Sequence, residues 1–211
     1  MFGRTGLYSI LFVALVAAAL AIAASSDNRP DPAASAEEAK PIQPGSALPD
    51  VDVRTESGET VKITAALAGK RAAIVFYRGH WCPFCVKHLA ELRKIAAELA
   101  GMDVQLAGIS PDKPEYLVEA KKKADLDFPI YSDSRLDLAR AMGVAFKLDP
   151  ETASRYRDHL VESTGHDTGQ LPVPAVFLID ESGKVAWVFS NPDYKVRLSN
   201  EDLIAAVKKA F

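Results

Sequence analysis

Two cysteines, Cys82 and Cys85, are the only thiols in the chain and lie three positions apart. The apolar run at residues 72–77 predicts a short buried strand before them, and apolar residues at helical spacing follow them. Pro83 suits the first position of a helix, where no backbone N–H is needed, and Gly101 suits a helix end. The sequence therefore predicts a dithiol in the first turn of a helix that follows a central strand.

This position favours redox chemistry. Free N–H groups and the positive end of the helix dipole stabilise a thiolate. Neighbours at i and i+3 on one turn can also form an intramolecular Cys82–Cys85 disulfide. Two other interpretations are buried structural cysteines and half of a zinc site. Zinc requires two further ligands, and the histidines offer no matched pair: they are His80, His88, His159 and His166. We expect a redox-active disulfide and no metal or other cofactor.

The overall composition is that of a globular protein with a substantial core. The chain has 211 residues, of which 48% are hydrophobic and 25% charged. Its formal net charge is −3, and its longest basic run is the lysine triplet at residues 121–123. Such a triplet is more typical of an exposed helix end than of a nucleic-acid surface. No nucleic-acid partner is expected.

The N-terminal region predicts export. Residues 7–24 form a nearly unbroken apolar run after Arg4, which is typical of a secretory signal or a membrane anchor. Ala21 and Ala23 form a small-x-small cleavage pattern that favours removal, whereas the length of the run is just sufficient to span a bilayer. We therefore interpret residues 1–24 as a signal peptide or anchor, with a membrane tether through residues 7–24 as the alternative. The exported protein would be periplasmic, otherwise extracytoplasmic, or secreted.

Residues 25–44 are rich in Pro, Ala, Ser and charge and predict a flexible linker, and residues 45–211 predict one domain. An N-terminal hairpin is indicated by two short strands around Ser57 and Gly58. Further strands are expected at 104–109, 128–131, 175–179 and 185–189. Helices are expected at 64–68, at 112–124 with a cap from Asp112 and Glu115, at 134–142 with a cap from Ser134, and at 201–210 with a cap from Asn200. A polar insertion at 150–170 is expected to contain one more helix, at about 155–162. This order predicts an α/β, thioredoxin-like fold: a central mixed β-sheet flanked by helices, with an N-terminal β-hairpin.

Several short segments resemble a known family. They occur in family order at residues 76–85, 109–112, 128–129 with 132–133, 173–175 with 177–180, and 193–194 with Arg197. Together they resemble the alkyl hydroperoxide reductase/thiol-specific antioxidant (AhpC/TSA) superfamily, and within it the peroxiredoxin-like branch with a Tyr-Arg-Gly-x-Trp-Cys-Pro-x-Cys signature. The resemblance spans about residues 45–211. It implies a thiol-dependent antioxidant oxidoreductase.

The resemblance places the family's nucleophile at Cys85, but nearby positions depart from the family pattern. Peroxiredoxins carry a Thr three positions before the nucleophile and a Pro seven before it, where this chain has Cys82 and Arg78. The Arg that polarises the peroxide before a late strand is replaced here by Pro174. In thioredoxins that position is a cis-proline packed against the dithiol, so a cis Val173–Pro174 peptide bond is expected.

Two mechanisms use the same residues differently. A peroxidase would use the Cys85 thiolate, Arg78 or Arg197 as the polarising cation, and Cys82 as the resolving thiol. A disulfide reductase would attack with an exposed Cys82 and release the mixed disulfide with Cys85. Trp81 would shield the pair and shape a partner groove, although ordinary packing explains it equally well.

His80 and His88, if protonated, would lower the thiol pKa values. An exposed loop position for His80 and a solvated helix face for His88 are the simpler interpretations.

Three functions remain open at this point. The favoured one is an exported thiol peroxidase that reduces hydroperoxides through a Cys82/Cys85 dithiol–disulfide cycle and is recharged by a thioredoxin-like or other thiol reductant. The alternative is a thioredoxin-like oxidoreductase that acts on exported protein disulfides. A non-catalytic redox-sensing module is third, because a disulfide that closes so small a loop adds little stability.

Overall fold

The computed structural model describes residues 29–67 and 69–211. The apolar run at 7–24 and the first four residues of the predicted linker lie outside the described residues. Within the described part of the chain, no helix is both long enough and apolar enough to cross a membrane.

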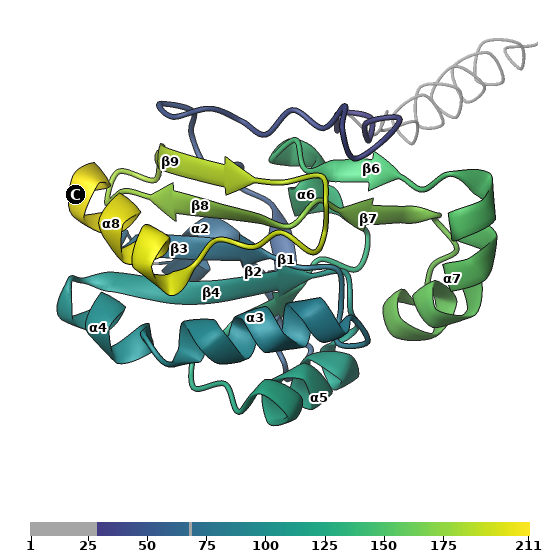
Figure 1. Cartoon of the computed structure of the whole chain (residues 1–211), viewed down its shortest axis with the longest axis horizontal. Coiled ribbons are helices and arrows are strands. Elements are labelled where there is room, and N and C mark those ends of the chain that lie inside the picture. Colours follow the sequence, from purple (N-terminus) through teal and green to yellow (C-terminus); the bar gives the residue numbers. More distant parts are fainter. Residues whose placement is uncertain (1–28, 68) are drawn as a thin grey trace, which may run out of the picture.

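A mixed β-sheet forms the centre of the molecule (Figure 1). Its strands are β1 (Asp52–Arg54), β2 (Thr60–Lys62), β3 (Arg71–Phe76), β4 (Val104–Ser110), β5 (Ile130–Ser132), β8 (Ala175–Ile179) and β9 (Val185–Ser190). Within the described residues their order is β2-β1-β5-β4-β3-β8-β9. Strands β3, β4 and β5 are parallel, whereas β8 pairs antiparallel with β3 and β9 antiparallel with β8. The predicted mixed sheet with an N-terminal hairpin is confirmed.

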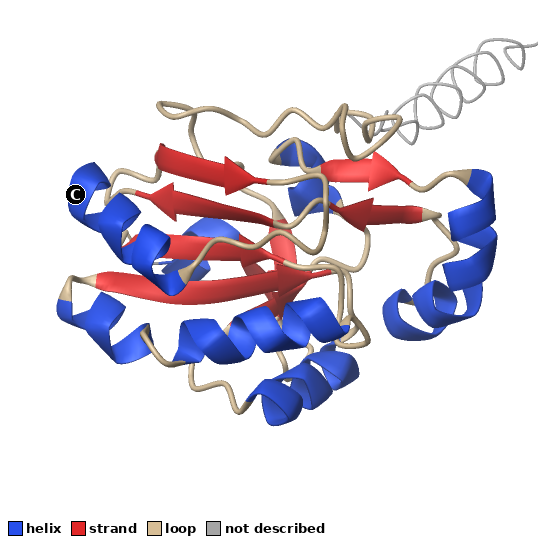
Figure 2. Ribbon diagram, viewed as in Figure 1, coloured by secondary structure: helices blue, strands red, loops and turns tan. Residues whose placement is uncertain are grey.

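Helices cover both faces of this sheet (Figure 2). One core lies between the sheet and α3 (Pro83–Arg93), α4 (Ala96–Gly101), α5 (Pro114–Ala124) and α8 (Asn200–Ala210); the other lies against α2 (Ile63–Leu67) and α6 (Asp137–Ala141). Strand β3 serves both cores, since Ala73 and Val75 belong to the first, and Ile74 and Phe76 to the second. A strand buried on both faces has apolar residues at successive positions, which explains the unbroken apolar run that precedes the cysteines.

The predicted polar insertion is more ordered than expected. Helix α7 (Pro150–Thr164) occupies most of it, and a two-stranded sheet of β6 (Ala145–Lys147) and β7 (Gln170–Pro172) connects α7 to the domain. Helix α7 begins early because Pro150 occupies its first turn and the Asp149 carboxylate accepts a hydrogen bond of 2.9 Å from the Thr152 N–H. The expected helix at 155–162 is thus the central part of a longer one.

The described part of the predicted linker is attached to the domain. Ala33 pairs with β6, since its N–H donates to Ala145 O and its carbonyl accepts from Lys147 N, each at 2.9 Å. Further along, Ile42 N–H donates to Met142 O at 3.1 Å. Residues 29–44 therefore differ from the expected free tether. Their composition gave no periodic signal because they lie along the domain surface without forming a helix or a long strand.

Helix boundaries differ from the predictions where a neighbouring side chain supplies the cap. Helix α6 begins at Asp137 instead of after Ser134, and the Asp133 carboxylate accepts from the N–H groups of Leu138 (3.1 Å) and Ala139 (2.8 Å). Helix α8 is capped by Ser199 instead of Asn200. Sequence spacing alone does not distinguish such adjacent cap candidates.

Two further predictions are wrong. The cysteine helix was expected to continue to about Gly101, but it ends at Arg93 and the chain resumes as α4. The described residues contain no cis peptide bond, so Val173–Pro174 is trans. Val173 and Pro174 connect β7 to β8, and the Val173 N–H donates to Val144 O at 2.8 Å.

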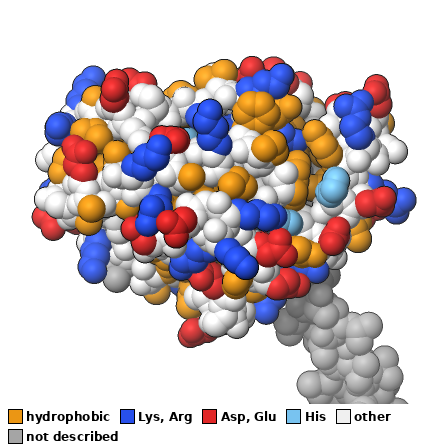
Figure 3. Space-filling model, turned by 60° about the horizontal axis from the view of Figure 1, so that its bottom comes forward, with side chains coloured by type: hydrophobic (Ala, Val, Ile, Leu, Met, Phe, Trp, Pro, Cys, Tyr) orange, Lys and Arg blue, Asp and Glu red, His pale blue; other side chains and the backbone are white. Residues whose placement is uncertain are grey.

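One face of the molecule carries mixed charge. On the face drawn in Figure 3, Lys and Arg side chains alternate with Asp and Glu, and hydrophobic side chains lie between them. Such interspersed charge is ordinary for a soluble domain surface.

Candidate active site

The two cysteines lie in the first turn of α3, as predicted. Cys82 is the N-cap residue, with an extended backbone conformation, and Pro83 begins the helix. The Cys85 thiol donates to the Cys82 sulfur, and the two Sγ atoms are 2.7 Å apart. The two cysteines are not joined by a disulfide bond in this structure. The prediction of an exposed Cys82 is wrong, because Cys82 is only 1% exposed and Cys85 is fully buried. Both belong to the core beneath α3.

The electrostatic environment distinguishes the two sulfurs. The hydrogen bond from Cys85 is the main cause that lowers the pKa of Cys82 from 9.0 to about 6, and the Cys85 N–H and the charges of Arg78 and Arg197 add to it. Burial and the same hydrogen bond raise the pKa of Cys85 well above its ordinary value. At neutral pH the pair therefore holds its negative charge on Cys82 and its proton on Cys85.

Arg197 lies at the site, as the resemblance implied. It follows β9 in the loop before α8, and its Nη2 atom is 3.4 Å from Cys85 Sγ. Its charge favours a thiolate on either cysteine. Arg197 is thus placed to stabilise the negative charge that moves between the two sulfurs.

Arg78 is the second cation of the site. It is 5% exposed, and its guanidinium carbon lies 4.2 Å from the ring centre of Tyr194, 5.2 Å from that of Trp81 and 5.4 Å from that of Tyr156. Cation–π contacts of this kind contribute about 0.5–2 kcal/mol each, according to their desolvation. The three rings hold the guanidinium in place without neutralising its charge.

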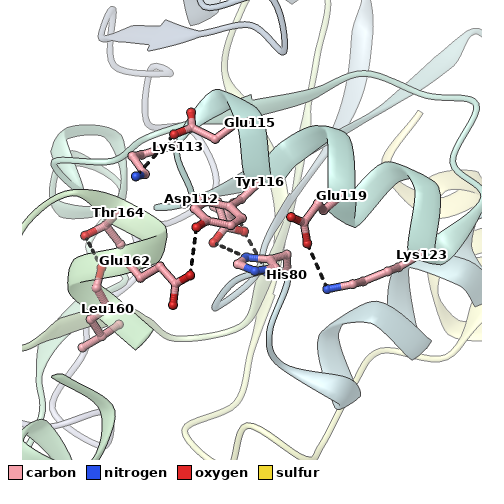
Figure 4. Close-up of polar contacts among 11 residues, drawn as sticks. His80, Asp112, Lys113, Glu115, Tyr116, Glu119, Lys123, Leu160, Glu162 and Thr164 are labelled. Atoms are coloured by element: carbon pink, nitrogen blue, oxygen red, sulfur yellow. Dashed lines mark hydrogen bonds and ion pairs between the residues drawn. The ribbon is translucent and has the colours of Figure 1, made fainter. Parts of the chain in front are cut away.

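The His80 side chain points towards the buried Asp112 (Figure 4). The Asp112 carboxylate accepts from the His80 N–H at 2.7 Å, lies 3.1 Å from His80 Nδ1, and accepts from Ser110 Oγ at 3.1 Å. The His80 ring stacks on Tyr116, with ring centres 4.4 Å apart. His80 is consequently a half-buried anchor of the loop before Cys82. Asp112 does not cap α5 as predicted, since its carboxylate is engaged with this loop.

Gly79 allows this loop to pass close to Asp112. Its φ angle is +148°, a value that residues with side chains rarely adopt. A Cβ atom at this position would lie 2.5 Å from Trp81 Nε1 and 2.9 Å from Asp112 Oδ1. Glycine is required at this point for the Arg78–Cys82 loop to keep its path.

His88 lies one turn beyond Cys85 and is half-buried, not solvated. Burial, followed by the charge of Arg197, lowers the pKa of His88 to about 4. Its Nε2 atom lies 3.2 Å from the Leu198 carbonyl oxygen and donates to it in the neutral ring. A neutral His88 gives no charge stabilisation to a thiolate at pH 7, so it ties α3 to the loop before α8.

The aromatic side chains near the cysteines pack against segments from later in the chain. Trp81 contacts Tyr156 of α7, with ring centres 5.3 Å apart, and Phe84 meets Tyr194 edge to face at 5.6 Å. Phe84 is 41% exposed, so it forms part of the outer surface beside the dithiol. The predicted shielding by Trp81 therefore takes the form of a wall shared with α7.

Pro174 lies one residue before Ala175, which pairs with Phe76 across β3 and β8. This register places Pro174 beside the start of the Arg78 loop, and both residues line one cavity together with Tyr156 and Tyr194. Of the four supporting residues predicted, Arg197 contacts the Cys85 sulfur, Trp81 directly precedes Cys82, and Arg78 and Pro174 line the neighbouring cavity. Sequence reasoning missed Tyr156, because it lies in the insertion that seemed irregular, and no local pattern connects it to Cys82.

The arrangement is suited to two-electron thiol chemistry. It combines a stabilised thiolate, a second protonated thiol within contact distance, and two guanidinium groups. A metal centre finds no support in the part of the chain that the structure describes, where no group of three or more potential His, Cys, Asp or Glu ligands is found.

Comparison with known proteins yields a consistent set of similarities. The model of the AhpC/TSA family matches residues 44–188. Peroxiredoxin Bcp of Bacillus subtilis is 29% identical over 144 residues, which cover 68% of this chain and 82% of the relative. Peroxiredoxin Bcp of Escherichia coli K12 is 32% identical over 104 residues, which cover 49% of this chain and 66% of the relative.

Solved structures agree on the fold. Peroxidoxin BcpB of Mycobacterium tuberculosis superposes with a TM-score of 0.62 at 21% identity, over 80% of this chain and 96% of that one. Reduced Prx3 of Vibrio vulnificus, solved in complex with H2O2, superposes with a TM-score of 0.64 at 18% identity, over 79% and 99% of the two chains.

Proposed function

The chain belongs to the AhpC/TSA family and is a peroxiredoxin-like thiol peroxidase, and from this premise we propose that Cys82 and Cys85 reduce hydroperoxides in a dithiol–disulfide cycle. One observation carries the proposal: a thiolate-forming Cys82 is buried beside Arg78 and Arg197, with the protonated Cys85 in contact. Because both sulfurs are buried in the reduced form, a small oxidant reaches them more easily than the disulfide of a folded protein does.

The proposed cycle assigns the first step to Cys82. Its thiolate attacks the terminal oxygen of the hydroperoxide, the O–O bond breaks, and the alkoxide takes up a proton to leave as an alcohol, or as water when the substrate is H2O2. Cys82 is oxidised to a sulfenic acid. The guanidinium groups stabilise the negative charge that passes from sulfur to the leaving oxygen.

Cys85 then resolves the sulfenic acid. Its sulfur forms a bond to Cys82 Sγ, the hydroxyl group leaves, and the thiol proton completes a molecule of water. The resulting disulfide is reduced by two thiol equivalents from a thioredoxin-like or other thiol reductant, through a mixed disulfide. No cofactor beyond this disulfide is needed. The proposed order reverses the alignment with the family, which places the nucleophile at Cys85. It rests on the hydrogen bond that the Cys85 thiol donates to the Cys82 sulfur and on the position of Cys82 at the N-cap of α3.

A single-turnover experiment tests this order. Reduced wild type, Cys82→Ser and Cys85→Ser are mixed with one equivalent of hydroperoxide, and sulfenic acid is trapped and located by mass spectrometry. We expect Cys85→Ser to consume one equivalent and to accumulate sulfenic acid on Cys82, and Cys82→Ser to react far more slowly. Rapid peroxide consumption by Cys82→Ser would show that Cys85 is the nucleophile.

Insulin reduction measured on the same proteins tests the alternative, a thioredoxin-like disulfide reductase. Cys82 at a helix start with a lowered pKa is the observation that favours this alternative. We expect weak insulin reduction next to rapid peroxide turnover. The reverse ranking would favour disulfide exchange on exported proteins.

Export is the last part of the proposal, and the apolar run at residues 7–24 supports it. Expression of the full chain in a bacterium, followed by fractionation and N-terminal sequencing, distinguishes a cleaved signal from a membrane anchor. Recovery of the intact chain in the cytoplasmic fraction would contradict export in either form.

A further inference from the structure

The guanidinium of Arg78 can bind an anion in addition to its effect on the thiols. Its Nε atom is buried and has no hydrogen-bond partner within residues 29–67 and 69–211. Burying a cation without an anionic or hydrogen-bonding partner costs free energy, and the arginine fork is matched in shape to a carboxylate. The three aromatic rings around Arg78 fix its orientation but present no acceptor oxygen to it.

Arg78, whose charge acts on Cys82, also lines a cavity of about 490 Å³. Its other walls come from β6 and α7, from the loops at Pro174 and Tyr194, and from Ala34 to Glu37 of the N-terminal segment. This volume lies in the range of pockets for small organic ligands, about 300–1,000 Å³. The cavity therefore combines an oriented buried cation with a lining of mixed polar and apolar side chains.

None of the other charged side chains that line the cavity pairs with Arg78 among the described residues. Asp149 faces the cavity, but its carboxylate accepts the Thr152 N–H and caps α7. Glu37 is exposed at the rim. Two further cations line the cavity: Lys147, which is exposed, and Arg155, which pairs with Glu151 at 2.7 Å.

We propose that this cavity binds the carboxylate of a small organic molecule, held by Arg78 and consumed in the redox cycle. The inference rests on the proposed peroxidase function and adds a ligand class to it. Two molecules of the cycle can supply the carboxylate: the hydroperoxide substrate, as a hydroperoxy acid, or a low-molecular-weight thiol acid that acts as the reductant.

The chemistry balances in both cases. A hydroperoxy acid loses its terminal oxygen to the Cys82 thiolate and leaves as a hydroxy acid, with its carboxylate unchanged. A thiol acid attacks the Cys82–Cys85 disulfide as a thiolate and forms a mixed disulfide, and one cysteine is released as a thiol. A second thiol acid then displaces the first, which yields the oxidised dimer of the thiol acid and the reduced enzyme.

Matched pairs of small molecules separate the two sources. Steady-state turnover is measured with a fatty-acid hydroperoxide and its methyl ester, each with dithiothreitol as reductant. It is then measured with 3-mercaptopropionate and its methyl ester as reductants, each with H2O2. We expect one of the two acids to exceed its ester in kcat/KM by about tenfold or more, as a charge-assisted hydrogen-bond pair provides.

Variants assign this preference to Arg78. The acid-to-ester ratio should fall towards one in Arg78→Gln and to an intermediate value in Arg78→Lys, which keeps the charge but loses the planar fork. A ratio is used because the effect of Arg78 on the Cys82 thiolate acts equally on acid and ester. Arg157→Gln is the charge-matched control, since Arg157 is an exposed α7 residue paired with Asp167. Glu37→Gln should raise the ratio by removing a like charge from the rim.

Binding is also measured without turnover, by titrating the tryptophan fluorescence of the full chain with benzoate. We expect saturable quenching in wild type and in Arg157→Gln, and its loss in Arg78→Gln. Equal kcat/KM for acid and ester in both pairs, together with no Arg78-dependent benzoate binding, would overturn the inference and leave the peroxidase proposal intact. Conversely, saturable benzoate binding in a protein that reduces no hydroperoxide would support the cavity and refute the proposed function.

Discussion

Replacing Cys85 by alanine is expected to raise the pKa of Cys82 substantially. In the wild type the hydrogen bond from Cys85 is the largest cause that brings this pKa from 9.0 to about 6. A hydrogen bond to a charged group is worth about 1.5–3 kcal/mol, which corresponds to about 1–2 pKa units. Alanine removes the donor and keeps the backbone N–H and both arginines, so the pKa should move to between about 7 and 8.

The change is large enough to measure at neutral pH. A thiol with a pKa of about 6 is roughly 90% thiolate at pH 7, whereas one with a pKa between about 7 and 8 is roughly 10–50% thiolate. The ultraviolet absorbance of the thiolate, followed across pH on reduced protein, gives the midpoint directly. Single-turnover rates with H2O2 at pH 7 should fall in proportion to the thiolate fraction.

Cys85→Ser is the matched control, because its hydroxyl can still donate to the Cys82 sulfur. We expect its midpoint to stay close to that of the wild type. A midpoint near 6 in Cys85→Ala would refute the role of this hydrogen bond. A midpoint near 6 retained in Cys82→Ser would place the thiolate on Cys85 and reverse the assignment of the two sulfurs.

Three further predictions concern the supports of the site. Gly79→Ala should destabilise the fold by about 1–3 kcal/mol, because the added Cβ would clash with Trp81 and Asp112. The same variant should also reduce peroxide more slowly. Unchanged thermal unfolding would contradict the close approach of Gly79 to Trp81 and Asp112. Asp112→Ala leaves the His80 N–H and the Ser110 hydroxyl without their acceptor, so calorimetry should show a loss of about 2–4 kcal/mol, with Lys123→Ala as an exposed control. Burial raises the pKa of Asp133 from 3.8 to about 7. The wild type should therefore lose stability as the pH rises through this interval, by roughly 4 kcal/mol at most. Asp133→Asn should lack this loss. Urea unfolding at pH 4 and pH 7 tests the last prediction, and parallel pH dependences of variant and wild type would refute it.

The sequence was most informative where one physical signal dominated. Strand β3 and the start of α3 follow from an apolar run, a proline and paired cysteines, and each of these signals is local. The mixed sheet followed from the order of the elements. Strand β8 was predicted with its observed bounds, Ala175–Ile179, because a fully buried strand requires apolar side chains at every position.

The misses involve contacts between distant segments. Asp112 looked like a helix cap because Glu115 follows at the capping-box spacing, but His80 of another loop occupies its carboxylate. Cys82 looked exposed because it lies at a helix tip, yet Trp81 and the segments around it cover the sulfur. The ring of Tyr156 reaches Arg78 from an insertion whose position no local pattern predicts. Burial and partner identity are properties of the packed molecule, so local periodicity does not encode them.

The attached N-terminal segment helps to shape the cavity beside Arg78. A linker ordinarily tolerates substitution, shortening and proteolytic trimming. Here residues 34–37 form one wall of the cavity beside Arg78, and Ala33 joins that wall to β6. Trimming before residue 29 would leave the cavity closed on this side, whereas trimming beyond Glu37 would open it to solvent. The N-terminal boundary of the chain would then determine which molecules the cavity accepts.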